Sequence, residues 1–486
     1  MLFSSVSFLY YFFPIVLLAY FLVPVRNGSV RARNFVLLGA SIVFYMWGEP
    51  VYVLLMLGQA VSGWFFGLLI ERGRGRGDKR LMKLALFGAV AVGVGCLGFF
   101  KYSDFFIANA NALFGASAGL LRLALPIGIS FYTFQILSYD IDLYSGAAKV
   151  QKNLPAFATY VTLFPQLIAG PIVRYVHVEE ALGSRKHTPE DFRLGARRFV
   201  FGLAKKVLIA NTLGELVAVY KASEAGGESS ALFVWLYAAA YALHIYFDFS
   251  GYSDMAIGIG RIFGFRFLEN FNYPYIAASV TDFWRRWHIS MSSWFRDYVY
   301  IRLGGNRVRP LRHLFNIVFV WLLTGFWHGA GWNFILWGLY YALLLLLEKY
   351  ILSRFAFLNN NKAPARFPLS ALRHFYVMLA FLVGWIFFDA DTLSQGAGRL
   401  SAMFGGADAF AGPEPLYYLR SYLVPLAVAA LGATPLPARA AACLAASGRG
   451  AKALSVLEPV FVLALLIVVT AYLVDGSFNP FIYFRF

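Results

Sequence analysis

The sequence contains little charge and almost no cysteine. Only 14% of its 486 residues are Asp, Glu, Lys or Arg, whereas soluble proteins average about 25%. A chain this poor in charge cannot cover a water-facing surface, which excludes an ordinary soluble protein and a disordered one. The two cysteines, Cys96 and Cys443, lie in apolar or alanine-rich surroundings. They suggest no disulfide framework, zinc site or thioester nucleophile.

Apolar and aromatic residues are abundant instead. Hydrophobic residues make up 60% of the chain, the mean hydropathy is +0.63, and apolar runs recur almost from end to end. This pattern indicates an all-α polytopic membrane protein, because a transmembrane barrel would show alternating strands of about ten residues. The net charge of +17 fits basic cytoplasmic loops that face anionic lipids or phosphates. We therefore expect the lipid bilayer as a partner and no nucleic acid.

The apolar runs predict about eleven transmembrane helices plus re-entrant or broken helices, all within one integral-membrane domain at 1–486. The run at 154–172 contains proline and glycine and is followed by a basic segment, which favours a broken or re-entrant piece. We expect a span at 230–247 and place 251–312 on the cytoplasmic side or half-buried in the protein. With basic loops inside, both termini are predicted to be extracytoplasmic.

His328 is the strongest candidate for chemistry. It lies late in an apolar run and precedes the small residues Gly329, Ala330 and Gly331. An ionisable group at membrane depth is costly, so it indicates a functional site, and imidazole is a suitable general base near neutral pH. The alternative is a histidine that only makes a hydrogen bond between helices.

His288 lies in an aromatic segment, residues 281–294, which we expect to form a helix with Thr281 as its N-cap. On such a helix Arg285, His288 and Ser292 share one face. This polar stripe favours a lined cavity. The equally weighted alternative is an interfacial helix with snorkelling arginines and anchoring tryptophans.

Seven arginines lie between residues 285 and 312. The candidates for holding an anionic cofactor are Arg285, Arg286, Arg302 and Arg307. Arginine matches phosphate oxygens in a bidentate way, although cytoplasmic topology and anionic lipids explain any one of them equally well. The acids Asp140, Asp142, Asp248 and Asp254 are expected to pair with arginine or to cap broken helices. No metal-ligand spacing is present, so no metal site is predicted.

Several longer segments resemble the membrane-bound O-acyltransferase family, in the branch of the alginate O-acetylation membrane proteins. The resemblance covers essentially the whole chain, with a signature core at about 125–345. The segments that carry it are Leu125-Pro-Ile-Gly-Ile-Ser-Phe-Tyr-Thr-Phe-Gln135, Phe164-Pro-Gln-Leu-Ile-Ala-Gly-Pro-Ile172, Tyr246-Phe-Asp-Phe-Ser-Gly-Tyr-Ser-Asp-Met-Ala256, Asp282-Phe-Trp-Arg-Arg-Trp-His-Ile-Ser290, Trp294-Phe-Arg-Asp-Tyr-Val-Tyr300 and Leu323-Thr-Gly-Phe-Trp-His-Gly-Ala-Gly-Trp-Asn333.

The resemblance implies a ring of helices around a central tunnel, with His328 and His288 as the family's two signature histidines. It also implies acetyl-CoA as an acyl donor rather than a permanently bound cofactor. The acetyl group would cross the bacterial inner membrane to an extracytoplasmic acetyltransferase partner and a polysaccharide acceptor. Three alternatives stay open: transfer of D-alanine from a carrier protein to teichoic acid, a polysaccharide exporter or proton-coupled transporter, and a structural scaffold for a synthase complex that would tolerate loss of both histidines.

Overall fold

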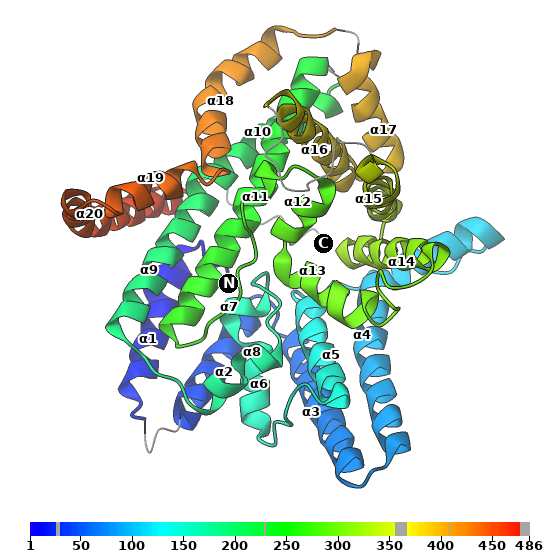
Figure 1. The fold of residues 1–486 in the computed structure, drawn as a ribbon, viewed down its shortest axis with the longest axis vertical. Coiled ribbons are helices and arrows are strands. Elements are labelled where there is room, and N and C mark those ends of the chain that lie inside the picture. The colour runs from blue at the N-terminus through cyan, green and yellow to red at the C-terminus, as the bar shows by residue number, and fades with distance from the viewer. Residues whose placement is uncertain (26–29, 228–229, 355–366, 408, 477–486) are drawn as a thin grey trace. The chain divides into compact units, whose positions relative to one another are not determined.

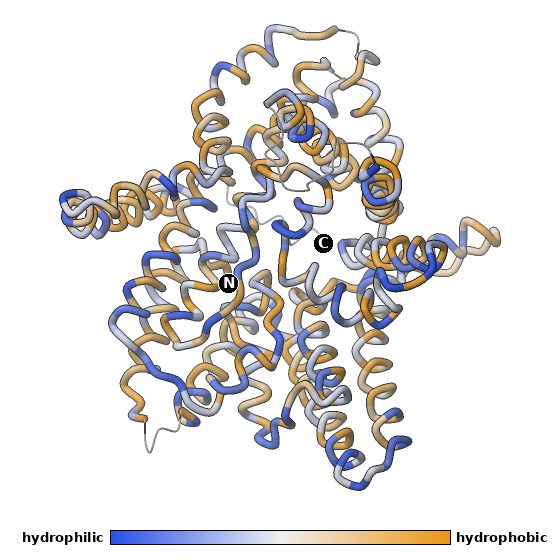
Figure 2. The backbone as a smooth tube through the Cα atoms, viewed as in Figure 1, coloured by the Kyte–Doolittle hydropathy of each residue, from blue (hydrophilic) through white to orange (hydrophobic). Residues whose placement is uncertain are grey.

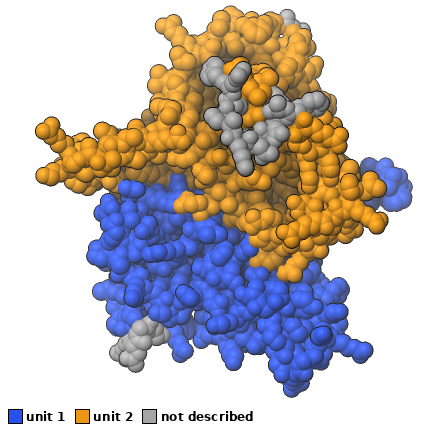
Figure 3. Space-filling view, in the orientation of Figure 1, with its two compact units in different colours: residues 1–199, 252–268 blue, residues 200–251, 269–486 orange. Residues whose placement is uncertain are grey.

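The computed structural model shows a helical chain (Figure 1) that folds into two compact units (Figure 3). The first unit comprises Met1–Phe199 with Tyr252–Leu268, and the second comprises Val200–Gly251 with Glu269–Phe486. The structure describes all residues except 26–29, 228–229, 355–366, 408 and 477–486. The described residues form no β-strand, and one isolated parallel bridge joins Ser230 and Ala409. The all-α prediction is confirmed.

The first unit is built around three helices that lie side by side, α3, α4 and α5 (Figure 1). Almost all of α5 is buried, and glycines on α3 allow it to approach closely. A Cβ at Gly67 would lie 2.7 Å from the ring of Tyr139. The helices of this unit are η1 (Phe8–Phe12), α1 (Phe13–Leu22), α2 (Arg31–Met46), α3 (Tyr52–Gly75), α4 (Lys79–Phe114), α5 (Ile129–Ser145), α6 (Leu154–Thr162), α7 (Phe164–Leu167), α8 (Tyr175–Gly183) and most of α9 (Pro189–Ala204).

The second unit has an aromatic core. The ring of Trp284 packs against those of Trp321 and Tyr341, with centroids 4.8 and 4.9 Å apart. Its elements are η2 (Lys205–Ala210), α10 (Asn211–Ala225), most of α11 (Ala231–Ile262), η3 (Pro274–Ile276), α12 (Val280–Arg286), α13 (Ile289–Phe295), η4 (Arg296–Tyr300), α14 (Pro310–His328), α15 (Trp332–Tyr350), η5 (Leu352–Arg354), α16 (Phe367–Asp389), α17 (Leu393–Ser401), η6 (Ala402–Gly406), α18 (Pro413–Gly432), α19 (Leu436–Ala445) and α20 (Gly448–Val474).

Six helices among the described residues are long and apolar enough to cross a membrane, and the bent pair of α18 and α19 makes a seventh if it is one span. Figure 2 shows apolar residues along α3 and α4 and hydrophilic residues at the turn that joins them. The multi-pass prediction is confirmed, although about eleven spans were expected. The difference includes short helices such as α2, with 16 residues, and α5, with 17. A straight span needs about 20 residues, and much of the apolar surface of α5 faces protein.

The predicted break in 154–172 is present. Helix α6 is followed by the single turn of α7 and then by buried non-helical residues. Side chains satisfy the interrupted backbone: Gln166 Nε2 donates to the carbonyl of Tyr160 at 2.6 Å. The backbone N–H of Phe164 donates to Ser41 Oγ at 3.1 Å. Irregular backbone is tolerated in a membrane protein where protein surrounds it in this way.

Helix α11 runs well past the predicted end at 247, because its acids meet cations. Asp248 forms an ion pair of 2.6 Å with Lys206, and Asp254 forms one of 2.8 Å with Arg198. The predicted pairing with arginine is therefore correct for Asp254, whereas Asp248 pairs with a lysine. The prediction is wrong for Asp140 of α5, which is fully buried and whose carboxylate oxygens have no hydrogen-bond partner among the described residues. Neutralised acids of this kind do not interrupt a buried helix.

Candidate active site

His328 is the last residue of α14 and is only 5% exposed. Three aromatic rings meet its imidazole edge-on: Trp327 at 4.7 Å between centroids, and Trp337 and Phe388 each at 5.0 Å. The next residue is glycine, and a Cβ at Gly329 would collide with the ring of Phe334 unless that ring shifted. The small residues after His328 therefore let α15 fold back onto α14 and enclose the imidazole.

His288 is completely buried and lies in a break between two helices. The expected single helix over 281–294 is wrong: α12 ends at Arg286, and His288 has a left-handed backbone with φ +43°. The N-cap of α12 is Ser279, whose side chain accepts from the N–H of Asp282. The expected cap, Thr281, instead donates its hydroxyl to a carboxylate oxygen of Glu348 at 2.7 Å. The predicted polar stripe is therefore interrupted at His288.

Asn270 explains the break and fixes the state of the imidazole. Its carbonyl oxygen accepts from the backbone N–H and the hydroxyl of Ser290, at 3.3 and 2.9 Å. The same oxygen lies 3.1 Å from His288 Nδ1, so Nδ1 carries the proton and donates to it. Nε2 of His288 is then the unprotonated nitrogen, and it is buried with no hydrogen-bond partner among the described residues. Full burial favours this neutral form.

Trp327 connects the two histidines. Its ring centroid lies 5.8 Å from that of His288 and 4.7 Å from that of His328. The ring of Phe249 packs on His288 at 4.6 Å. The structure therefore brings the two predicted histidines, 40 residues apart in sequence, around one indole in an aromatic environment.

The four candidate arginines differ in their surroundings. Arg286 is half-buried and held by Asp282 at 2.9 Å and by the carbonyl of Asn272 at 3.3 Å. Arg285, Arg302 and Arg307 are exposed. Their guanidinium groups are accessible to an anionic ligand, whereas that of Arg286 has a structural partner. The described residues contain no group of three or more His, Cys, Asp or Glu side chains suited to a metal ion.

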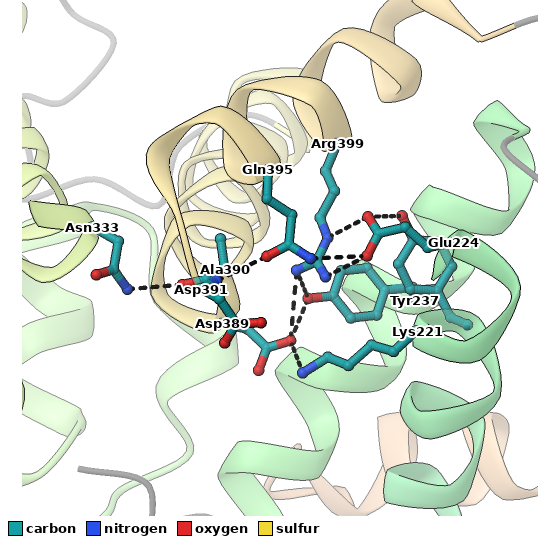
Figure 4. Close-up of polar contacts among 10 residues, drawn as sticks. Lys221, Glu224, Tyr237, Asn333, Asp389, Ala390, Asp391, Gln395 and Arg399 are labelled. Carbon is teal, nitrogen blue, oxygen red and sulfur yellow. Dashed lines mark hydrogen bonds and ion pairs between the residues drawn. The ribbon is translucent and has the colours of Figure 1, made fainter. Parts of the chain in front are cut away.

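Sequence reasoning missed a buried polar network next to His328 (Figure 4). Asp389 is its centre: its carboxylate forms an ion pair of 2.6 Å with Lys221 and accepts a hydrogen bond of 2.5 Å from Tyr237. Arg399 donates to Tyr237 at 2.8 Å and forms two hydrogen bonds of 2.7 Å with the carboxylate of Glu224. These residues come from four helices and carry no motif, so their proximity could not be found from sequence spacing.

This network fixes the end of α16 beside His328. Phe388, which packs on His328, directly precedes Asp389. The carbonyl of Ala390 accepts a hydrogen bond of 2.9 Å from Asn333, the last residue of the motif that contains His328 (Figure 4). The two residues after Phe388 are thus both held by other helices, Asp389 through its side chain and Ala390 through its backbone carbonyl.

Known proteins match more than half of this chain. The model of MBOAT, the membrane-bound O-acyltransferase family, matches residues 118–388. The chain is 41% identical over 412 residues to the probable alginate O-acetylase AlgI of Azotobacter vinelandii, which covers 84% of this chain and 79% of that protein. It is 34% identical over 433 residues to the peptidoglycan O-acetyltransferase of Helicobacter pylori, with 83% and 80% covered.

A more distant similarity, 29% identity, extends to the teichoic acid D-alanyltransferase of Bacillus subtilis, over 45% of this chain and 58% of that protein. The matched segment 118–388 contains both His288 and His328. The family model spans more than half of the chain, and two relatives above 30% identity align with more than four-fifths of it. The chain therefore belongs to the membrane-bound O-acyltransferase family and is a multi-pass membrane O-acyltransferase.

Proposed function

We propose that this enzyme takes acetyl groups from cytoplasmic acetyl-CoA and delivers them across the membrane for O-acetylation of an extracytoplasmic polysaccharide. The observation that carries the proposal is the enclosure of His328 and His288 around Trp327. The relatives support acetyl as the group transferred, since those aligned over most of the chain are named for alginate O-acetylation and peptidoglycan O-acetyltransfer.

His328 acts as the general base in this proposal. It removes the proton of an acceptor hydroxyl while the oxygen attacks the thioester carbonyl. A C–O bond forms, the C–S bond breaks, and the CoA thiolate leaves and takes up the proton from the imidazolium. General-base catalysis of this kind contributes about 10²–10⁴ in rate, and low exposure keeps water from competing for the acyl group.

His288 has a role limited by its tautomer. Because Nδ1 donates to Asn270, Nε2 offers a lone pair and cannot donate a hydrogen bond to a carbonyl oxygen. Two roles are open to His288: it could orient or polarise the thioester, or share a proton with His328. Proton sharing with His328 fits this state, whereas polarisation of the thioester requires a protonated Nε2.

The exposed arginines are our candidates for the phosphates of the donor. Arg302 and Arg307 lie in the loop before α14, the helix that ends at His328. Guanidinium groups bind phosphate with paired hydrogen bonds, and the basic character of these loops favours the cytoplasmic side. We accordingly assign the chain to the bacterial inner membrane with both termini extracytoplasmic. An extracytoplasmic acetyltransferase partner would complete transfer to the polysaccharide.

The test uses purified protein in proteoliposomes with radiolabelled acetyl-CoA. CoA release is followed for the wild type, His328→Ala, His288→Ala and a control, His177→Ala, which changes an exposed histidine outside the site. We expect at least a hundredfold lower rate for His328→Ala and wild-type behaviour for His177→Ala. Equal rates for the wild type and His328→Ala, with both proteins eluting as folded species, would overturn the proposal.

The same vesicles distinguish the alternatives. D-alanyl transfer predicts no consumption of acetyl-CoA and consumption of D-alanine bound to a carrier protein. An exporter predicts polysaccharide flux that survives His328→Ala without thioester cleavage. Cell-envelope extract supplies the partner and the acceptor in a parallel reaction, so that a missing acceptor is not mistaken for a missing activity.

A further inference from the structure

A second cluster of polar residues lies in the first unit, where no catalytic role is assigned. Arg33 at the start of α2 and Arg185 before α9 both stack on the ring of Tyr20, with their guanidinium carbons 5.1 and 5.6 Å from its centroid. Arg185 is only 8% exposed, and its guanidinium also lies 4.5 Å from the ring centroid of Phe265. His187 completes the cluster through a contact of 2.8 Å between Nε2 and the hydroxyl of Tyr20.

The hydrogen bonds of this cluster fix the charge on each group. Arg33 can only donate, so His187 Nδ1, 3.2 Å from Arg33 Nη1, is the accepting and unprotonated nitrogen. His187 is therefore neutral, and its Nε2–H donates to the hydroxyl of Tyr20. That hydroxyl also accepts from Arg185 Nε at 2.8 Å and donates to the carbonyl of Phe263 at 3.1 Å. The cluster holds two positive charges and no internal negative charge.

No carboxylate among the described residues pairs with either arginine. Their acceptors are neutral oxygens: Arg33 donates to the carbonyl of Val23, and Arg185 donates to Asn34 Oδ1 and the carbonyl of Ala181. Nη2 of Arg185 is buried with no partner within the described part of the chain.

The nearby acid is already engaged. Asp191 accepts from Thr188 and pairs with Arg261 at 3.0 Å. Two neighbouring guanidinium groups with a buried, unsatisfied donor are costly unless an anion compensates them.

Apolar side chains border the cluster on its exposed side. Phe21 is 38% exposed, lies 5.7 Å from the guanidinium carbon of Arg33 and packs on the His187 ring at 5.7 Å. Leu22, next on α1, is 79% exposed, and Phe192 of α9 is 44% exposed and packs on Phe21. A ligand that fits this surface carries an anionic group and a hydrocarbon chain together, which is the chemistry of a phospholipid.

We propose that Arg33 and Arg185 bind the phosphate of an anionic phospholipid whose acyl chain lies along Phe21 and Leu22. Each guanidinium carries a positive charge that suits a phosphate group, and both guanidinium groups stack on the ring of Tyr20. Asn34 keeps Arg185 in place, since its amide nitrogen donates to the carbonyl of Leu182 at 2.8 Å while its oxygen accepts from Arg185. This site is independent of the proposed acyl transfer.

The test measures lipid binding to delipidated full-length protein by native mass spectrometry. The probes are phosphatidylglycerol, phosphatidylethanolamine and inorganic phosphate, each with the wild type, Arg33→Gln and Lys186→Gln. Lys186 is an exposed cation next to Arg185 in the loop before α9. Its variant therefore removes an equal charge without altering the contacts of Tyr20. We expect phosphatidylglycerol to bind roughly fivefold more weakly to Arg33→Gln, as for loss of one basic residue facing an anionic headgroup. Lys186→Gln should bind it like the wild type.

Three outcomes would overturn the proposal. Unchanged phosphatidylglycerol binding by Arg33→Gln would show that the cluster holds no headgroup. An equal loss in Lys186→Gln would show diffuse attraction to basic loops. Binding of inorganic phosphate with the same Arg33 dependence, and no preference for phosphatidylglycerol, would identify a free-anion site. Arg33→Lys distinguishes geometry from charge, since lysine keeps the charge and should recover only part of the affinity.

Discussion

The ring of Phe388 packs edge-on against His328, with their centroids 5.0 Å apart, and Asp389 anchors the backbone immediately after it. The end of α16, which contacts the candidate base through Phe388, is held by the contacts of Lys221 and Tyr237 with the carboxylate of Asp389 (Figure 4). Asp389 is linked to the imidazole through the neighbouring ring of Phe388. Its effect on catalysis would be exerted through Phe388, as a positioning residue.

We expect Asp389→Asn to lower kcat while KM for acetyl-CoA changes little. The amide keeps the volume of the carboxylate but leaves Lys221 without its counter-ion, so the end of α16 should become less fixed beside His328. Breaking a fully buried pair costs about 3–5 kcal/mol, and we expect less here because Lys221 is 28% exposed. Steady-state kinetics and thermal unfolding in detergent measure both effects.

Glu414→Gln is the matched control for Asp389→Asn. Glu414 accepts a hydrogen bond from Ser223 at 3.1 Å. This variant therefore also replaces a carboxylate with an amide, but at a residue that is not adjacent to Phe388 in the chain. If folded Asp389→Asn retains the wild-type kcat, the positioning role is wrong.

A second prediction separates the fold of His288 from its chemistry. Its φ of +43° is a conformation that asparagine adopts more readily than alanine. His288→Asn and His288→Ala should both lose thioester consumption. The alanine variant should in addition be less stable, by roughly 1 kcal/mol. Denaturation midpoints and single-turnover rates for the pair measure this, and activity in His288→Asn would rule out an essential imidazole.

The sequence singled out His328 and His288 because both lie in local motifs, and their catalytic roles stay predictions. His328 is flanked by glycines, and the structure uses them to fold α15 against α14. The break at His288 was missed, because it depends on Asn270, 18 residues earlier, whose oxygen collects three contacts. A helical period in aromatic residues gives no sign of such a long-range partner.

The expected number of spans, about eleven, exceeds the six or seven helices of sufficient length and hydropathy among the described residues, for a related reason. Hydropathy does not distinguish residues buried in protein from residues that face lipid, and α5 is apolar largely because protein surrounds it. The network around Asp389 could not be predicted from the sequence for another reason. The residues that meet there, from Lys221 to Arg399, are separated by up to 178 positions.

A third prediction concerns the exposed arginines. Arg302→Gln and Arg307→Gln should raise KM for acetyl-CoA with little change in kcat, because they remove charge that attracts phosphate without altering the histidines. The rise should shrink at high salt, since screening weakens exposed charges. Arg296→Gln is the control: Arg296 is also exposed but pairs with Asp297 at 2.7 Å. Equal KM values for all three variants and the wild type would remove these arginines from the donor site.

The fourth prediction follows from the neutral state of His187. Burial lowers the pKa of His187, and the neighbouring charges of Arg33 and Arg185 lower it further, against smaller opposing effects of the Phe263 carbonyl and Asp191. In the unfolded chain the imidazole regains a pKa of about 6.5. Below that pH the unfolded state binds a proton that the folded state rejects, so stability falls as pH falls.

His187→Gln removes this proton uptake and keeps a side chain able to bond Tyr20. Between pH 7.5 and 5.5 the wild type should therefore lose roughly 1–2 °C more in Tm than the variant, an effect moderated by solvent screening of a half-exposed group. The measurement is thermal unfolding of both proteins in the same delipidated detergent state across that range. Adding phosphatidylglycerol should reduce the difference, because a bound phosphate offsets the arginine charges and makes the protonated imidazole less costly. Identical pH profiles for the two proteins without lipid would show that His187 binds protons equally in both states.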